Sequence, residues 1–276
     1  MNREEFSARI RQVRLSPTQK VGQEAEALKA QGIDIINLGP GEPDFDTPPH
    51  IKEAARAALD DNFTKYTANA GIVELREAIC QRYSQDYGFT SNVKNVIVSA
   101  GGKQALFNVA MAVLNPGDQV IVHAPGWPTI VDQIRLVGAK PVVVRTHPED
   151  GFKVGSTQII EALTPRTRMI VINSPGNPTG GLISEEDLRQ IAVTVENRGI
   201  WITLDLCYER LVYDDKPHNL PAVLQEVLPT RCVLVGSLSK TYAMTGWRCG
   251  WAIGKASAKT SCAKTTRPRS RFSSSI

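Results

Sequence analysis

From Val93 onward the chain alternates short apolar runs with amphipathic stretches. The runs are rich in Val, Ile and Leu and have the length of buried strands, while most are separated by stretches with helical spacing of apolar residues. Such alternation predicts an α/β fold with a mostly parallel sheet of about seven strands and helices on both faces. We expect strands within VKNVIVSA, DQVIVHAP, KPVVVRT, TRMIVINSP, IWITLDL, RCVLVGSL and GWRCGWAIG. We expect helices within GKQALFNVAMAVL, WPTIVDQIRLVG, STQIIEAL and SEEDLRQIAVTVENRG, the last with Ser184 and Asp187 as a capping box.

The part of the chain before Val93 contains three helix patterns and one strand pattern. Residues 16–32 are expected to form a helix with Ser16 as its N-cap, Pro17 in the first turn and Gly32 at its end. The segment IDIINLG is expected to form a short strand, and the turn-rich GPGEPDFDTPP follows it. Two more helices are expected within IKEAARAALDD and IVELREAICQRYSQDY.

The composition changes at residue 255. The segment 255–276 contains six serines, six basic residues, no acidic residue and no periodic pattern, which is typical of disorder. The net charge of +4 includes these six basic residues, so residues 1–254 carry −2 and do not predict a nucleic-acid partner. We divide the chain into an N-terminal arm and helix (1–46), a large domain (47–254) and a basic, Ser-rich tail (255–276).

Length, hydropathy and cysteine content narrow the class of protein. At 276 residues and 42% hydrophobic, the chain is long enough to bury a sizeable core. No apolar run approaches the length of a membrane span, and the charged start MNREEFSARIRQVR does not resemble a secretory signal. The five cysteines are odd in number and scattered, which is typical of reduced thiols and not of a disulfide framework or zinc site. We therefore expect a cytoplasmic protein without a metal or a membrane partner.

Polar and aromatic residues follow the ends of several expected strands. In an open α/β sheet, ligands bind beyond the carboxyl ends of the strands, so these residues share one edge. Gly102 and Lys103 open a helix whose free N–H groups can bind an anion, although a tight turn is the more common reason for a Gly pair. Trp127 offers a flat face to a ring or packs in a core. Asn177 lies in the turn GNPTGG, where it donates to an oxygen or serves the turn alone.

Asp205 and Lys240 carry the strongest chemistry at this edge. Asp205 closes an apolar run, and a buried carboxylate needs a partner, either a protonated ring nitrogen or an Arg or Lys side chain. Tyr208 is close enough in sequence to share its site. Lys240 lies between Ser237 and Arg248, and its amine could form an imine with a carbonyl group next to a bound phosphate. The alternative is a solvated loop residue, which is the more common role of a lone lysine. Together these groups meet the needs of pyridoxal 5'-phosphate, which the sequence predicts as cofactor.

Five segments carry a resemblance to a known family. SLSKTYAMTGWR, NSPGNPTGG, LGPGEPDFDTP, TKYTANAGIVELREAI and GGKQALFN resemble class I aminotransferases of fold type I, and most of all the bacterial aspartate aminotransferase subgroup. The likeness runs from about Ser7 to Gly254. It implies the large domain of the type I pyridoxal-phosphate transferases. In that family a C-terminal small domain follows, with an arginine that binds the substrate α-carboxylate, and we expect this chain to be truncated before it.

The resemblance implies a role for each matching position. Lys240 matches the lysine that forms the Schiff base with the cofactor and moves the proton at the substrate α-carbon, and Asp205 matches the partner of the pyridinium nitrogen. Asn177 and Tyr208 match donors to the phenolic oxygen, and Trp127 matches the aromatic residue that stacks on the ring. The other implied positions are Gly102, Lys103, Ser237 and Arg248 at the cofactor phosphate, Tyr66 at the phosphate of a neighbouring subunit, Gly39 with Trp127 and Asn177 at the substrate, and Arg14, Ser16, Thr18 and Lys103 at its acidic side chain.

These roles imply an aminotransferase that moves an amino group between an amino acid, aspartate or glutamate, and a 2-oxo acid. Tyr66 further implies a homodimer with shared active sites. One local departure is Leu206, where family members commonly have an acidic residue, so that local polarity falls while Asp205 and Tyr208 keep their spacing.

Three alternatives stay open. A fragment that dimerises or binds cofactor without turnover follows from the expected truncation. Another pyridoxal-phosphate enzyme, a carbon–sulfur lyase or a decarboxylase, would use the same lysine, acid and phosphate site. The string from Ser237 to Lys240 also fits the S-x-x-K pattern of serine β-lactamases, but the S-D-N and K-T-G elements of that class do not occur in the chain.

Overall fold

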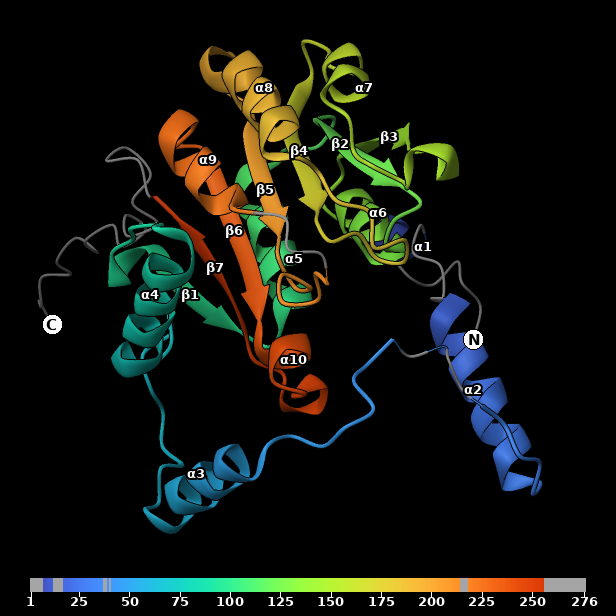
Figure 1. The fold of residues 1–276 in the computed structure, drawn as a ribbon, viewed down its shortest axis with the longest axis vertical. Coiled ribbons are helices and arrows are strands. Elements are labelled where there is room, and N and C mark those ends of the chain that lie inside the picture. Colours follow the sequence, from blue (N-terminus) through green and yellow to red (C-terminus); the bar gives the residue numbers. More distant parts are fainter. Residues whose placement is uncertain (1–6, 12–16, 37–38, 40, 214–217, 256–276) are drawn as a thin grey trace, which may run out of the picture.

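The core of the molecule is a seven-stranded sheet. The structure, a computed structural model, describes residues 7–11, 17–36, 39, 41–213 and 218–255. The strand order is β1-β7-β6-β5-β4-β2-β3 (Figure 1). β7 is antiparallel to both of its neighbours, and all other neighbouring pairs are parallel, which confirms the predicted fold class. The strands are β1 (Val96–Ser99), β2 (Gln119–Ala124), β3 (Lys140–Arg145), β4 (Thr167–Asn173), β5 (Trp201–Asp205), β6 (Cys232–Ser237) and β7 (Gly250–Gly254).

Helices cover both faces of this sheet. One face packs against α4 (Val73–Tyr87), α7 (Ser156–Glu161), α8 (Glu185–Val195) and α9 (Leu220–Val227), and the other against α5 (Gly102–Val113) and α6 (Pro128–Leu136). Figure 1 shows α2 (Pro17–Ala30) and α3 (Pro49–Asp60) standing apart from this body. The short elements are α1 (Ala8–Arg11), α10 (Leu238–Thr241) and the 3-10 turns Val93–Asn95, Pro148–Asp150, Glu196–Arg198 and Thr245–Trp247.

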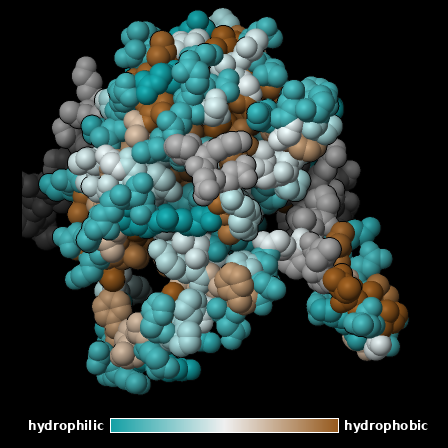
Figure 2. Space-filling model, viewed as in Figure 1, coloured by the Kyte–Doolittle hydropathy of each residue, from teal (hydrophilic) through white to brown (hydrophobic). Residues whose placement is uncertain are grey.

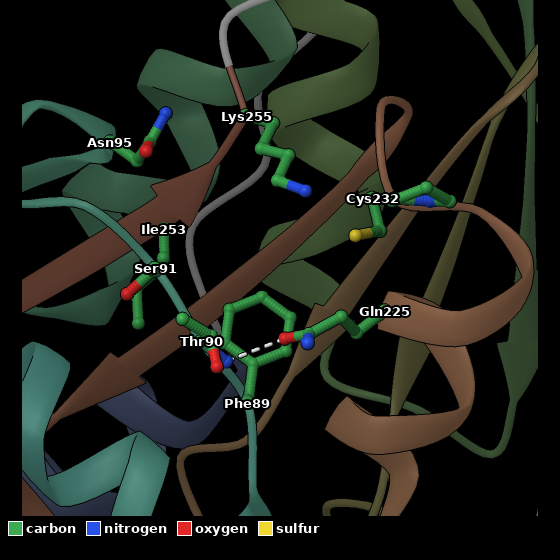
Figure 3. A pocket seen from close by; sticks show the side chains of 9 residues that line it. Phe89, Thr90, Ser91, Asn95, Gln225, Cys232, Ile253 and Lys255 are labelled. Carbon is green, nitrogen blue, oxygen red and sulfur yellow. Dashed lines mark hydrogen bonds between the residues drawn. The ribbon is translucent and has the colours of Figure 1, made fainter.

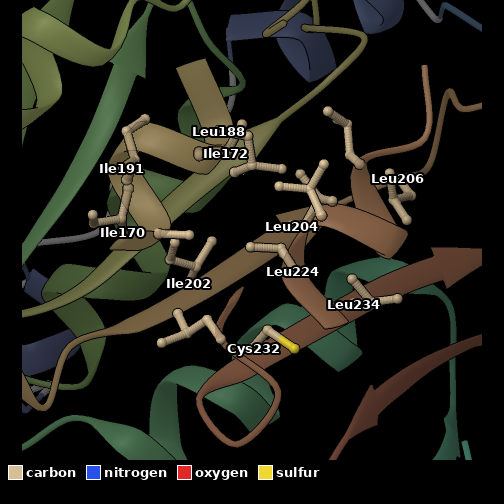
Figure 4. Close-up of a cluster of buried hydrophobic side chains, with 14 of the residues drawn as sticks. Ile170, Ile172, Leu188, Ile191, Ile202, Leu204, Leu206, Leu224, Cys232 and Leu234 are labelled. Atoms are coloured by element: carbon tan, nitrogen blue, oxygen red, sulfur yellow. The ribbon is translucent and has the colours of Figure 1, made fainter. Parts of the chain in front are cut away.

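Alternate residues of the central strands enter two separate cores. In β4, Ile170 and Ile172 pack toward α8 and α9, whereas Met169 and Val171 pack toward α5 and α6. Because both faces are buried, each strand needs apolar residues at successive positions, which is why the strands appear as continuous apolar runs. Figure 4 shows the first core, in which Leu204 of β5 lies among side chains of the sheet and its covering helices.

Helix α8 begins at the predicted N-cap, Ser184, but the described contacts give only half of the predicted capping box, because the Asp187 carboxylate accepts from other donors than the Ser184 N–H. The Ser184 hydroxyl accepts a hydrogen bond from the Asp187 N–H at 3.0 Å, which satisfies one of the free donors of the first turn. The Asp187 carboxylate in turn accepts from the hydroxyl groups of Ser184 and Ser156. These bonds lower the pKa of Asp187 against the opposing effect of burial. The carboxylate thereby ties the starts of α7 and α8 together.

The strand expected for IDIINLG does not form in the described part of that segment. Residues 33–36 and Gly39 are outside any strand, and Ile36 is 86% exposed. A strand requires a neighbour for its backbone groups, and this segment runs between the outlying α2 and α3, away from the sheet (Figure 1). Figure 2 shows hydrophobic residues gathered around α2, where the space-filling surface stands off from the main body.

Other element predictions differ from the structure in smaller ways. Helix α9 was not predicted; its N-cap is Asn219, whose side chain accepts from the Ala222 N–H. The run GWRCGWAIG begins with a 3-10 turn, and only Gly250–Gly254 is strand. The expected disorder of 255–276 falls, apart from Lys255, outside the described residues. No helix in the described part of the chain is both long enough and apolar enough to span a membrane.

The buried β5 allows a test of the core. Leu204 is fully buried, so the Leu204→Ala variant loses its packing and leaves a cavity, with an expected loss of about 2–5 kcal/mol in the free energy of unfolding. Urea denaturation measures this change. The matched variant Val193→Ala shortens a side chain that is 57% exposed on α8, and its unfolding free energy is expected to stay close to that of the parent. Equal effects of the two variants would contradict the assigned core.

Candidate active site

The carboxyl ends of β4, β5 and β6 bring the candidate residues to one edge of the sheet. The register places Asn173 beside Asp205 and Asp205 beside Val235. Ser237 ends β6, and Lys240 follows within α10. The crossover topology therefore assembles residues that are more than sixty positions apart in sequence, as expected for the ligand edge of a parallel sheet.

Asp205 is a buried carboxylate at the end of β5. It is 2% exposed, and burial raises its pKa above the ordinary value for an aspartate. The Cys207 N–H donates to its Oδ1 at 3.1 Å. No Lys or Arg in the described residues forms an ion pair with it, so the salt-bridge alternative for this residue finds no support in the described chain. A protonated ring nitrogen would supply the missing positive partner.

Asn177 and Tyr208 form a hydrogen-bonded pair near the end of β5. The Asn177 Nδ2 donates to the Tyr208 hydroxyl at 3.1 Å. Asn177 is itself held by Asn173, whose Oδ1 accepts from the Asn177 N–H at 2.8 Å and whose Nδ2 donates to the Asp205 carbonyl at 3.2 Å. Burial, followed by the charges of Cys207 and Asp205, raises the pKa of Tyr208 to about 12, so the phenol stays protonated and able to donate at neutral pH.

Lys240 is a half-buried amine next to this pair. Its Nζ lies 5.9 Å from the centroid of the Tyr208 ring and donates to the Gly41 carbonyl at 2.7 Å. Burial lowers the pKa of Lys240 below that of an ordinary lysine, and Arg248 acts in the same direction, while Glu42 opposes it. A lowered pKa makes the neutral, nucleophilic amine more abundant near neutral pH.

Gly102, Ser237 and Arg248 form a compact group at the start of α5, which we call the anion site. A side chain on Gly101 would collide with the Arg248 guanidinium, and a Cβ on Gly102 would come within 3.7 Å of Ser237 Cβ. Arg248 has a positive φ of 53° and donates to the carbonyls of Thr245 at 2.6 Å and Ala100 at 3.4 Å. Free N–H groups at a helix start, a hydroxyl and a guanidinium together suit a phosphate.

Lys103 and Trp127 lie together beside the anion site. The Lys103 Nζ is 5.1 Å from the centroid of the Trp127 ring, within cation–π range. Gln133 of α6 donates to the Lys103 carbonyl at 2.8 Å and joins the two helices. Trp127 is partly exposed at the N-cap position of α6, so one part of the ring is free for contact.

The described contacts do not test the roles of the remaining predicted residues. Tyr66 is fully exposed in the segment between α3 and α4. Gly39 is half-buried. Arg14 and Ser16 lie outside the described residues, as does the side chain of Thr18. Their predicted roles therefore stay predictions.

The structure also reveals contributors that the sequence pattern did not identify. Asn173 orients Asn177, and Cys207 donates to Asp205 while its Sγ lies 3.6 Å from the Ser237 hydroxyl. The backbone N–H of Asn173 donates to His123 Nε2 at 3.2 Å. Burial lowers the pKa of His123, which keeps the ring neutral and able to accept. Asn173, a polar residue directly after an apolar run, was visible in the sequence, whereas the other two contacts depend on pairing in space.

Leu206, the departure from the family pattern, does not point into the site. Its side chain is 2% exposed within the first core (Figure 4). The polarity of the site at this position is therefore set by Cys207 and Tyr208, which keep their places beside Asp205.

Two pockets lie at opposite edges of the sheet, one of them next to the candidate site. A groove of about 520 Å³ is lined by Glu42–Thr47 and by Ala243, Thr245, Gly246 and Trp247, next to the contact of Lys240 with Gly41. Its size suits a small-molecule ligand. The other pocket, of about 10 Å³, contains Cys232 at the start of β6 and Ile253 near the end of β7, and thus lies at the opposite edge (Figure 3). It has room for about one water molecule.

The residues at the carboxyl edge fit pyridoxal phosphate. The buried Asp205 lacks a cation in the described chain, Asn177 and Tyr208 offer hydrogen-bond donors, and Lys240 offers an amine of lowered pKa. The anion site lies at the adjoining start of α5. This donor set corresponds group by group to the ring nitrogen, phenolic oxygen, aldehyde and phosphate of that cofactor.

Comparison with known proteins places the chain in a family. The model for "aminotransferase class I and II" matches residues 33–276, and the match continues beyond Gly254, where we expected the likeness to end. The probable aspartate/prephenate aminotransferase of Thermus aquaticus is 42% identical over 268 residues, which cover 95% of this chain and 69% of that protein. The aspartate/prephenate aminotransferase of Cereibacter sphaeroides is 43% identical over 250 residues, covering 90% and 62%.

Solved structures agree with this assignment. The aspartate aminotransferase of Thermus thermophilus with maleate matches with a TM-score of 0.86 and 42% identity, over 90% of this chain and 64% of that one. The aspartate aminotransferase of Rhizobium meliloti matches with a TM-score of 0.84 and 40% identity. The chain belongs to the aminotransferase class I and II family. The resemblance stated from the sequence is thereby confirmed, and the chain spans about two thirds of the length of these relatives.

The buried carboxylate has a pH-dependent consequence. Because the pKa of Asp205 is raised in the folded chain, the stability that this group contributes is present at acidic pH and lost as the pH rises through the raised value. At neutral pH the buried anion therefore costs stability, and the neutral amide of Asp205→Asn does not. Without cofactor, we expect Asp205→Asn to melt at a higher temperature than the parent at pH 7, with the difference vanishing near pH 4, about the ordinary aspartate pKa.

Thermal melts monitored by circular dichroism across this pH range provide the measurement. Asp60→Asn, at an exposed position on α3, serves as the control and is expected to leave the melting temperature unchanged at each pH. An Asp205→Asn variant that melts below the parent at pH 7 would show that the carboxylate already has a compensating partner.

Proposed function

We propose that this protein is a pyridoxal-phosphate-dependent aminotransferase that moves an amino group between an amino acid and a 2-oxo acid. The observation that carries the proposal is Asp205, a buried carboxylate with no cation in the described chain, on the same edge as Lys240 and the Asn177–Tyr208 pair. Membership in the aminotransferase class I and II family supports it. Since the chain spans about two thirds of its relatives, its own turnover is part of the proposal.

Each residue has a defined task in this reaction. When bound, pyridoxal phosphate supplies an electron-withdrawing ring that stabilises negative charge at the substrate α-carbon. Asp205 accepts a hydrogen bond from the ring N–H and keeps its proton in place, because an anion at that depth strongly favours a positive partner. Lys240 anchors the cofactor and moves the proton at the α-carbon, a step favoured by its lowered pKa.

The other residues bind and orient. Asn177 and Tyr208, which already form a hydrogen-bonded pair, would donate to the phenolic oxygen of the cofactor, and Trp127 would hold its ring. The anion site, together with Lys103, holds the phosphate, with Arg248 as its charged member. For the substrate, the proposal keeps Gly39, Trp127, Asn177, Lys103, Arg14, Ser16 and Thr18 as the binding positions.

An acidic amino donor is the proposed substrate. The names of the relatives include aspartate, and maleate, a dicarboxylate, accompanies the Thermus thermophilus structure. Lys103, held near the site over Trp127, carries the positive charge that a second carboxylate requires. Because two relatives are named for prephenate as well, which contains a 2-oxo acid group, prephenate is a candidate acceptor.

A homodimer in the cytoplasm completes the proposal. Tyr66 is fully exposed and would reach the phosphate of a neighbouring subunit, and the same region exposes Phe45, Leu59 and Phe63. Exposed apolar side chains in one region are typical of an interface. The four cysteines in the described residues are free thiols, which supports a reducing compartment.

Covalent capture of the cofactor tests the role of Lys240. Pyridoxal phosphate mixed with the protein and reduced with borohydride is expected to leave one cofactor attached to Lys240, detected by peptide mass spectrometry. Lys240→Ala is expected to lose this label, whereas Lys94→Ala, at an exposed position, retains it. Labelling that is equally strong at other lysines would remove Lys240 from the proposed site.

The donor is tested on the cofactor-loaded protein. With aspartate or glutamate we expect release of the corresponding 2-oxo acid, at least about tenfold faster than with leucine or phenylalanine, because an acidic side chain has a charged partner in the site. Liquid chromatography of the released 2-oxo acid measures the rate. Faster reaction of leucine or phenylalanine would refute an acidic donor, and labelled protein without any release would indicate a cofactor-binding chain that does not turn over.

A further inference from the structure

The turn that carries Tyr208 is held from its far side by α4. Glu209, the next residue, forms an ion pair with Arg82, whose Nη2 donates to Glu209 Oε1. The Tyr87 hydroxyl donates to the other carboxylate oxygen at 2.8 Å. Glu209 is 3% exposed and Arg82 15%, so both charges are largely withdrawn from water. Separating the two side chains would leave an uncompensated buried charge, which is strongly unfavourable, so the pair holds both in place.

Further contacts keep Arg82 itself in place. Its guanidinium lies 5.1 Å from the centroid of the Tyr83 ring and pairs with Asp86 at 3.1 Å. Asp86 also accepts from Arg210, the residue after Glu209. Two successive residues of the turn are therefore tied to one helix. This helix contributes none of the residues that the proposed function uses.

The backbone links this attachment to Tyr208. The Glu209 N–H donates to the Leu206 carbonyl at 3.0 Å, and the Leu211 N–H donates to the Tyr208 carbonyl at 2.8 Å, so the turn is closed by two hydrogen bonds. The side chains of Tyr208 and Glu209 leave this turn toward different partners, one toward Asn177 and the other toward α4. A shift of Glu209 would therefore move the adjacent phenol.

We propose that Arg82 and Glu209 are positioning residues for Tyr208: their buried pair sets the turn so that the phenol stays hydrogen-bonded to Asn177. The consequence for cofactor binding rests on the proposed function, whereas the effect on the phenol does not. Preorganised donors bind a ligand better than mobile ones, since less freedom is lost on binding. The pair thus acts on the site through Tyr208 and touches no reacting group.

Paired substitution separates this role from simple stabilisation. Removing one partner, as in Arg82→Met, is expected to lower the melting temperature, but Arg82→Met with Glu209→Leu replaces both charges with apolar groups and is expected to regain most of it. The matched control is Arg189→Met with Glu226→Leu, which removes an exposed pair between α8 and α9 joined by two bonds of 2.8 Å.

The direct readout is the Tyr208 resonance in cofactor-free protein labelled with carbon-13 at the ζ-carbon of its six tyrosines. Tyr208→Phe identifies the resonance. In the Arg82/Glu209 paired variant we expect it to move toward the position of an exposed tyrosine such as Tyr213, while the Arg189/Glu226 variant leaves it in place. An unmoved Tyr208 resonance in a folded paired variant overturns the proposal. If that variant does not fold, Glu209→Gln, which keeps the size and removes the charge, decides by the same shift.

Cofactor affinity provides the second readout. We expect the paired variant to bind pyridoxal phosphate about tenfold more weakly than the parent, the scale of one hydrogen bond to the ligand, and the control variant to bind as the parent does. Unchanged affinity with a moved resonance would overturn the link to the cofactor. Failure of the parent itself to bind pyridoxal phosphate would instead refute the proposed function, and the resonance shift would still test the positioning of Tyr208.

Discussion

A carboxylate buried at the end of a central strand, with no cationic partner among the described residues, is the constraint on which the rest of the site depends. Asp205 is held there by strands on both sides and by the N–H of Cys207. The raised pKa of Asp205 reflects the cost of burying its negative charge. A ligand with a protonated nitrogen removes that disadvantage, so binding and folding are coupled at this residue. The neighbouring donors, Asn177 and Tyr208, need only be in place before the ligand arrives.

The sheet and the site were predictable from sequence for the same physical reason. Parallel strands buried on both faces require continuous apolar runs, and their carboxyl ends meet at one edge, so a polar residue directly after a run, such as Asp205, marks the ligand side. Runs alone do not show which strands are neighbours, however. The prediction of a strand for IDIINLG was wrong for this reason. A strand needs a neighbouring strand, and the residues 33–36 themselves do not show that they lie away from the sheet.

Contacts made through the backbone or across elements could not be read from the sequence. The bond from Lys240 to the Gly41 carbonyl joins two segments that are 199 positions apart, and any residue at position 41 offers the same carbonyl. The Asn173 amide, which supports Asn177, is one among several polar residues in the motif NSPGNPTGG. Arg82 and Glu209 each appear in sequence as ordinary charged positions, and only the packing of α4 against the turn buries them.

The antiparallel strand β7 has a consequence for the order of folding. It lies between β1 and β6, and its Gly250 sits so close to Gly101 and Gly102 that a side chain there would collide with their backbone. Val96 of β1 pairs with Ile253, so the first strand in sequence reaches the sheet only through the last. Such long-range pairing is slow to form. During synthesis on a ribosome, β1 and the start of α5 would therefore reach their final positions only after β7 has been made. The anion site would then form late, together with the completed sheet.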